Sequence, residues 1–263
     1  MQKRKKAKKK AKEPKSPLCK RGKSHCCIMF RIMPPPSSKE AEAKKSKSKE
    51  KKKKERSKKA KENKKQPPNM NTFRSSVLAG ICIGIAGFGY LAEKSIIGAV
   101  LFAFGLLTVV HYGLRLYTGT AGFIKKNEGG RLLFILFGNI VGCLLVALIA
   151  RCSPMPLQDT AQKILEGRLA VGPLKGGILA IGCGFIMTTA VTFARKGQNL
   201  PLLFGVPLFI MCGFPHCVAD AYYYLCVPVS FIADNWLSVL IFYVSIVIGN
   251  FIGCNIYRLI WRD

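Results

Sequence analysis

Six long stretches of mainly apolar residues fill the chain after residue 70, and they limit the folds open to it. About 20 such residues in a helix cross the hydrocarbon core of a bilayer. The stretches lie at about residues 74–92, 96–123, 131–151, 173–194, 201–232 and 236–260. Little sequence remains for a soluble domain, so we predict an all-α membrane protein with six transmembrane helices over residues 70–263.

The second and fifth stretches are interrupted near their middles. The second contains "HYGLRLYTGTAG" and the fifth contains "CGFPHCVAD", so both carry glycines and two ionisable side chains, and the fifth also carries a proline. Non-helical backbone at membrane depth is tolerated only where it is buried in protein or lines a watery cavity. Ionisable side chains at that depth usually mark a pathway or a binding site.

The third and sixth stretches share a motif, "GNIVGC" at 138–143 and "GNFIGC" at 249–254. Small residues recur in packed membrane helices, which is one explanation of the match. The other, which we favour, is a 3+3 inverted repeat with one interrupted helix in each half, as in transporters and channels. The site is then expected where the breaks meet, at His216 and the region centred on Thr118.

Residues 1–69 form a Lys-rich segment that we predict to be disordered. They contain 28 Lys or Arg and six Glu, and so carry +22 of the formal net charge of +29. The expected roles are a solvated tail or an anionic-lipid contact; nucleic acid is disfavoured because no aromatic residues are interleaved. A second interpretation is that this segment is a mis-called start and that the folded protein begins at Met70.

Neither metal nor cofactor chemistry is indicated by the sequence. The eleven cysteines lack paired CxxC spacing, including Cys19, Cys26 and Cys27 beside His25. There is no HExxH motif and no serine or cysteine nucleophile with a defined base, although Cys217 is next to His216. We therefore predict no cofactor, no metal and no enzymatic activity.

These motifs, in this order, resemble the formate/nitrite transporter family. The matching pieces are "LFAFGLL" leading into "GLRLYTG", then "GNIVGC", "GFPHCVAD" and "GNFIGC". The resemblance covers residues 74–262 or so and implies an aquaporin-like protomer within a homopentamer. It also implies transport of small monovalent anions such as formate, nitrite, hydrosulfide or larger monocarboxylates, with proton involvement.

The resemblance also implies roles for individual residues. The family's central histidine falls on His216 and its loop threonine on Thr118. The remaining carried-over positions are two apolar constrictions, at Phe102 with Leu106 and at Phe209, supporting asparagines Asn139 and Asn250, and an anion-attracting residue at Arg168.

Two departures change the charge near the predicted centre. The family usually has an acidic residue where this chain has Arg115, and asparagine where it has Asp220. We hypothesise that Arg115 and Asp220 form a buried ion pair between the two breaks. The alternative is that Arg115 is unpaired, faces the pore and acts as a second anion-binding group.

The sequence therefore predicts proton-linked transport of a small weak-acid anion, with histidine at the centre because its pKa lies near physiological pH. Loop charges place both termini in the cytoplasm and the protein in the plasma or inner membrane. A hydrosulfide or neutral-solute channel of the same fold is the first alternative. A membrane tether with a lipid- or nucleic-acid-binding tail is the second.

Overall fold

The computed structural model describes residues 70–125 and 127–260, and every regular element in those ranges is a helix. The predicted tail at 1–69 lies outside them. The helices, in chain order, are α2 (Met70–Ala92), α3 (Ile96–His111), α4 (Tyr117–Ala121), α5 (Gly129–Ala150), α6 (Leu157–Val171), α7 (Pro173–Ala194), α8 (Leu200–Met211), α9 (Cys217–Cys226) and α10 (Val229–Ile260).

Four of these helices, α2, α5, α7 and α10, are long and apolar enough to cross a membrane. They correspond to the first, third, fourth and sixth predicted stretches. The second stretch is divided into α3 and α4, and the fifth into α8 and α9, so both predicted interruptions are present. We call residues 112–116 the first break and residues 212–216 the second break.

One predicted boundary is wrong, and one helix was not predicted. The fifth stretch was expected to reach residue 232, but α9 ends at Cys226 and α10 already begins at Val229. Pro228 separates them, because proline has no amide hydrogen to continue a helix. No element was assigned between the third and fourth stretches, and that region contains a further helix, α6.

Both breaks begin with the same backbone turn. Gly113 and Gly213 have φ of +62° and +67°, a conformation that glycine adopts without steric cost. In each turn the following amide closes back on the preceding helix: Leu114 donates to the Val109 carbonyl and Phe214 to the Phe209 carbonyl, both at 2.9 Å. Glycine at these positions therefore ends α3 and α8 in the same way.

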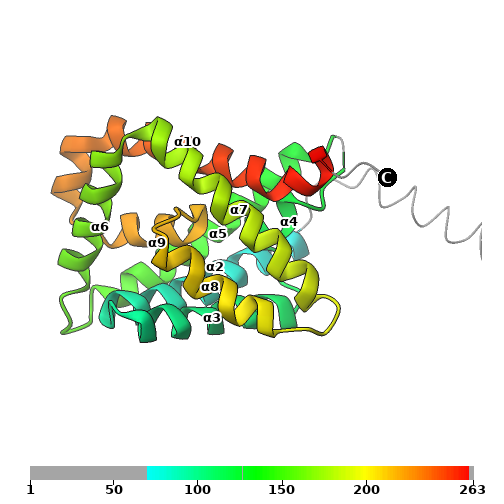
Figure 1. Cartoon of the computed structure of the whole chain (residues 1–263). Helices are drawn as coiled ribbons and strands as arrows, with labels where there is room; N and C mark the ends of the chain where they lie inside the picture. Colours follow the sequence, from blue (N-terminus) through cyan, green and yellow to red (C-terminus); the bar gives the residue numbers. More distant parts are fainter. Residues whose placement is uncertain (1–69, 126, 261–263) are drawn as a thin grey trace, which may run out of the picture. The chain divides into compact units, whose positions relative to one another are not determined.

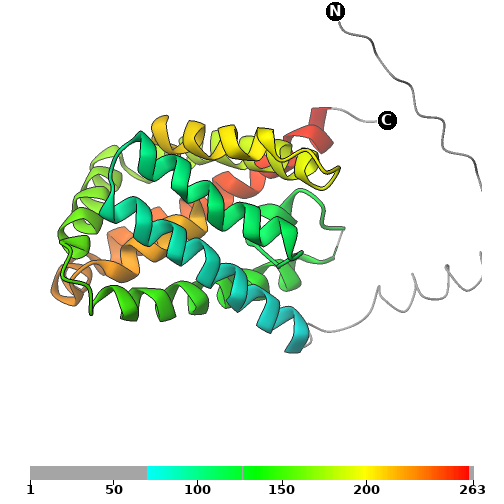
Figure 2. The ribbon, with the colours of Figure 1, turned by 90° about the horizontal axis from the view of Figure 1, so that it is seen from below.

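The long helices pack in two pairs, α2 with α5 and α7 with α10 (Figures 1 and 2). Glycines permit the close approach. A Cβ on Gly142 would meet the Val77 carbonyl oxygen, and one on Gly253 would meet the Ile181 carbonyl oxygen. The "GNIVGC" and "GNFIGC" motifs thus supply small residues at both contacts.

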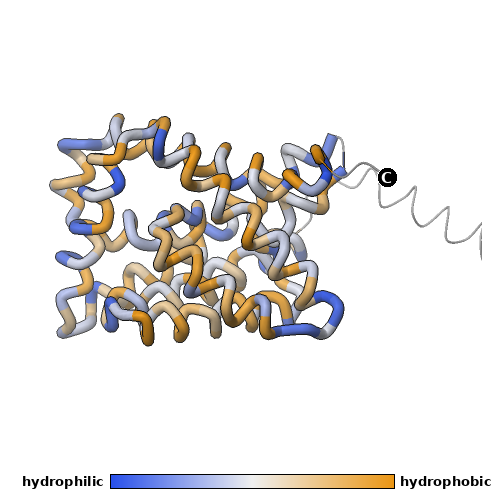
Figure 3. Tube along the Cα trace, in the orientation of Figure 1, coloured by the Kyte–Doolittle hydropathy of each residue, from blue (hydrophilic) through white to orange (hydrophobic). Residues whose placement is uncertain are grey.

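The short helix α9 lies in the interior, where all of its residues except Leu225 are buried. It contacts α5, α6, α2 and α10 (Figure 1). Hydrophobic residues run along most of the helices (Figure 3), and many apolar side chains are exposed. On α5 and α10 the exposed ones include Leu133, Phe137, Leu144, Leu148, Trp236, Leu240, Ile241 and Ile248.

We expect Gly142→Ala to destabilise the protein, because the added methyl group would press on the α2 backbone. Overpacking of this kind costs about 1–3 kcal/mol. Gly89→Ala, also in a helix, is the matched control, since nothing lies within 4 Å of a Cβ there. Thermal unfolding in detergent measures both. Equal melting temperatures for the two variants would contradict the glycine-mediated contact.

Candidate functional site

Asparagine side chains hold both breaks in place. The Asn139 side chain accepts a hydrogen bond from the Tyr117 amide at 2.9 Å and donates to the carbonyls of Ser76 and Arg115. Asn250 repeats the pattern: it accepts from the Cys217 amide at 2.8 Å and donates to two carbonyls on other segments. Each asparagine therefore satisfies backbone groups that the break leaves without helical partners.

His216 and Thr118 meet between the two breaks. The Nε2 atom of His216 lies 2.9 Å from the Thr118 hydroxyl oxygen, and both residues are buried. The Nδ1 atom accepts a hydrogen bond from the Ala219 amide at 3.1 Å. Because a ring nitrogen that accepts carries no proton, the neutral imidazole must hold its proton on Nε2. His216 therefore donates to Thr118, whose own hydroxyl hydrogen remains available to another acceptor.

Aromatic rings enclose the histidine on one side. The Phe209 ring stacks on the imidazole with centroids 5.6 Å apart, and Phe102 meets Phe209 edge to face at 6.3 Å. Leu106 lies one helical turn from Phe102 on α3, and all three apolar side chains are buried. These contacts join Phe102 and Phe209, one residue from each predicted constriction, beside His216.

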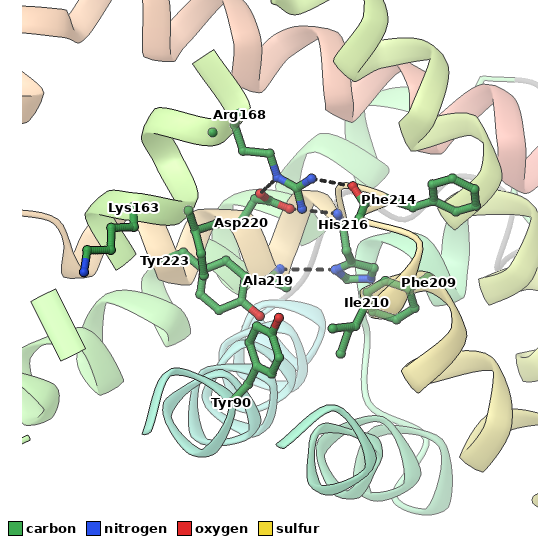
Figure 4. Close-up of a pocket in the computed structure, with 13 residues that line it drawn as sticks. Tyr90, Lys163, Arg168, Phe209, Ile210, Phe214, His216, Ala219, Asp220 and Tyr223 are labelled. Carbon is green, nitrogen blue, oxygen red and sulfur yellow. Dashed lines mark hydrogen bonds and ion pairs between the residues drawn. The ribbon is translucent and has the colours of Figure 1, made fainter. Parts of the chain in front are cut away.

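A cavity of about 240 Å³ adjoins His216 and is lined by residues of α2, α6, α8 and α9. Arg168 projects from α6 toward α9, where its Nε donates to Asp220 Oδ1 at 3.0 Å (Figure 4). Its guanidinium also donates to the Gly213 carbonyl. Asp220 in turn accepts from the His216 amide at 2.8 Å and from the Tyr224 hydroxyl at 3.3 Å.

The hypothesised ion pair between Arg115 and Asp220 is wrong, because Arg168 occupies that role. The error has a physical source: Arg168 was expected in the vestibule, but α6 was not predicted, so the contact between Arg168 and Asp220 was not expected. Asp220 is 1% exposed and Arg168 19% exposed, which makes theirs a shielded pair. Much of the positive charge expected of Arg168 in this vestibule is therefore offset.

Arg115 lies instead in a second cavity of about 140 Å³, which α3, α4, α7 and the first break enclose. Arg195 lines the same cavity, and its guanidinium donates to the Gly119 carbonyl at 2.8 Å. Leu106 and Thr120 also contribute to the walls. The sequence indicated Arg195 only as one of several loop charges, and nothing in its spacing pointed to this cavity.

Other residues near the centre were not singled out from the sequence. Tyr224 bonds Asp220, and Tyr90 and Tyr223 line the cavity on the side of α2 (Figure 4). A run of tyrosines in α9 was the available signal, but only the buried position of α9 gives it meaning. Among the described residues, no group of three or more His, Cys, Asp or Glu is arranged to hold a metal ion.

Comparison with known proteins yields one matching family model, described as formate/nitrite transporter, over residues 51–260. One curated relative is the formate channel FocA of Haemophilus influenzae, 23% identical over 57% of this chain and 64% of its own length. Another is the uncharacterized transporter YrhG of Bacillus subtilis, 28% identical over 62% of this chain and 69% of its own length.

Solved structures show the same fold. A pentameric formate channel with formate bound aligns with a TM-score of 0.61 at 21% identity, covering 73% of this chain and 94% of that one. An ion channel described as a member of the FNT family aligns with a TM-score of 0.58 at 18% identity, covering 72% and 87%. At these identities the likeness concerns the fold alone.

A double-mutant cycle tests the ion pair. Arg168→Gln and Asp220→Asn should each lower the melting temperature, because breaking one partner of a buried pair costs about 3–5 kcal/mol. The double variant should lose less stability than the sum of the losses in the two single variants.

The matched cycle uses Arg115→Gln with Asp220→Asn, which should be additive because these residues lie in different cavities. If Asp220→Asn were coupled to Arg115→Gln and additive with Arg168→Gln, Asp220 would pair with Arg115, and the ion pair with Arg168 would be contradicted.

Proposed function

The chain belongs to the formate/nitrite transporter family, and from this premise we propose that it carries small monovalent weak-acid anions, such as formate or nitrite, across a membrane. The observation that supports this best is the buried hydrogen bond between His216 and Thr118. It joins the two breaks at a point enclosed by aromatic rings, with a cavity at either end of the enclosure.

An anion that loses its hydration water at this point gains few hydrogen bonds from the protein in exchange. Bringing a bare carboxylate into an apolar region costs tens of kcal/mol by an idealised estimate. The amides at the start of α9 do not offset that cost, because those of His216, Cys217 and Ala219 already bond protein side chains. The arrangement suits a neutral solute better than an anion, which supports proton-linked passage as the neutral acid.

In this proposal His216 acts as a neutral donor that positions the Thr118 hydroxyl. Its Nδ1 accepts from the Ala219 amide, so adding a proton there would require losing that bond. The Thr118 hydroxyl, which accepts from Nε2, directs its own hydrogen toward the passing solute. The proton that neutralises the anion then comes from the acidic bulk solvent, as hydronium that reaches the adjoining cavity and is left as water, and His216 need not donate one.

The proposal extends to the assembly and the membrane topology. The paired hydrogen bonds of Asn139 and Asn250 support an inverted 3+3 repeat in which α3–α4 and α8–α9 each count as one interrupted span. The fold match to a pentameric channel supports a homopentamer. Basic residues near Arg74, Arg131 and Arg195 support cytoplasmic termini in a cell membrane. We propose transport without covalent chemistry.

Uptake by proteoliposomes tests the function directly. With a pH gradient, acid outside, the protein should accelerate entry of radiolabelled formate or nitrite. His216→Phe should lower that uptake about tenfold, as expected for loss of a buried hydrogen bond worth roughly 1–1.5 kcal/mol. Thr118→Ala should have a similar effect, and Thr118→Ser should retain activity.

His111→Phe is the matched control, because His111 is an exposed histidine at the end of α3, away from the His216 cavity. Unchanged uptake by His216→Phe, with the same pH dependence as the parent, would remove His216 from the pathway. A panel of formate, nitrite, hydrosulfide and lactate in the same assay would identify the preferred solute.

A further inference from the structure

The cavity that contains Arg115 and Arg195 differs in charge from the cavity beside His216. Arg168, at the His216 cavity, is paired with Asp220 and also donates to a carbonyl. The Arg115 guanidinium makes no ion pair or hydrogen bond with any of the described residues, and Arg195 bonds only a carbonyl there. Within the part of the chain that the structure describes, no acidic side chain lines this second cavity.

The backbone holds Arg115 firmly in place although its side chain is free. Its amide donates to the Ser75 hydroxyl at 3.1 Å, and its carbonyl accepts from Asn139 at 2.9 Å. Arg195 is held from the other wall by its bond to Gly119 and by the Phe123 ring, 3.9 Å below its guanidinium carbon. The backbone of Arg115 and the side chain of Arg195 are therefore both anchored beside one cavity, and the Arg115 guanidinium keeps its donors unused by the described residues.

Electrostatics indicates what would stabilise this arrangement. Partial burial, and next the charge of Arg115, lower the pKa of the Arg195 guanidinium below its usual value. An anion between the two groups would relieve the repulsion. Guanidinium groups bind carboxylates and similar oxyanions with paired, charge-assisted hydrogen bonds. The volume of about 140 Å³ equals roughly four or five water molecules, enough for a small carboxylate with residual water.

We propose that Arg115 and Arg195 form a binding site for small carboxylates and similar oxyanions at the end of the pathway opposite Arg168. The site rests on the proposed function, since it would hold the transported anion before its passage. Leu106 lines this cavity and lies one turn from Phe102, which contacts Phe209 beside His216. An anion held there stands at the entrance to the apolar enclosure.

The consequence is unequal affinity at the two ends. The pathway should saturate at a lower formate concentration from the Arg115 end than from the Arg168 end, because, among the described residues, the Arg115 cavity is lined by two cations without a carboxylate partner and the other cavity by one, Lys163. Sealed vesicles of each orientation, containing the full chain and supplied with radiolabelled formate, measure the two half-saturation concentrations separately.

Arg115→Gln is the main variant, because this side chain has no structural contact to lose. It should raise the half-saturation concentration from its own end by about three- to tenfold, as expected for one charge-assisted contact, and leave the opposite end unchanged. Arg115→Glu should raise it further and Arg115→Lys less. Lys196→Gln is the matched control: it removes the same charge beside Arg195 but does not line the cavity. Equal effects of Arg115→Gln and Lys196→Gln would overturn the site.

Binding distinguishes failure of the site from failure of transport. Binding is measured by the exchange broadening of the ¹³C-formate resonance when the purified full chain is added in detergent. The broadening should persist in the His216→Phe variant. It should be lost in the double variant that also carries Arg115→Glu. If no variant moves formate but this difference in broadening is present, the site stands and the transport proposal falls. If the parent transports formate and the broadening is the same with and without Arg115→Glu, the site falls and transport stands.

Discussion

The hydrogen bonds of two buried asparagines, Asn139 and Asn250, support the rest of this structure. A helix interrupted inside an apolar region leaves amides and carbonyls that lipid cannot satisfy. Each asparagine spans a break with one acceptor and two donors, so a single side chain reconnects the break to a neighbouring helix. Only with both breaks held can His216 and Thr118 approach to 2.9 Å.

Much of the fold could be predicted because its constraints are local. Apolar length indicated the spanning helices, and Gly113 and Gly213 mark turns that glycine alone adopts easily. The hidden element was α6, whose composition is polar enough to resemble a loop. Because this segment is a helix, Arg168 lies over the second break. Such a tertiary contact cannot be predicted from the periodicity of the sequence.

The same reason explains which parts of the site escaped prediction. The pairing of His216 with Thr118 could be anticipated, because two breaks in one membrane layer must be buried together. The partner of Asp220 could not, because Arg115 and Arg168 are equally good cations in sequence terms. Choosing between them requires the positions of α6 and the first break, which depend on helix packing.

The charges of the two cavities differ because of two residues, Asp220 and Arg115. An aspartate at 220 places a carboxylate under the cation of α6, and Tyr224 and the His216 amide hold it there. The charge of Arg168 is thereby offset, and Lys163 is the remaining cation of that cavity in the part of the chain that the structure describes. Arginine at 115 adds a cation where Arg195 already stands, so positive charge is concentrated at the other end. Because the central enclosure is apolar and the amides of His216, Cys217 and Ala219 are occupied, an anion would be stabilised most at the Arg115 end and least beside His216. A weak acid can pass such a barrier by taking a proton and can recover its charge beyond it, whereas a strong-acid anion of the same size cannot.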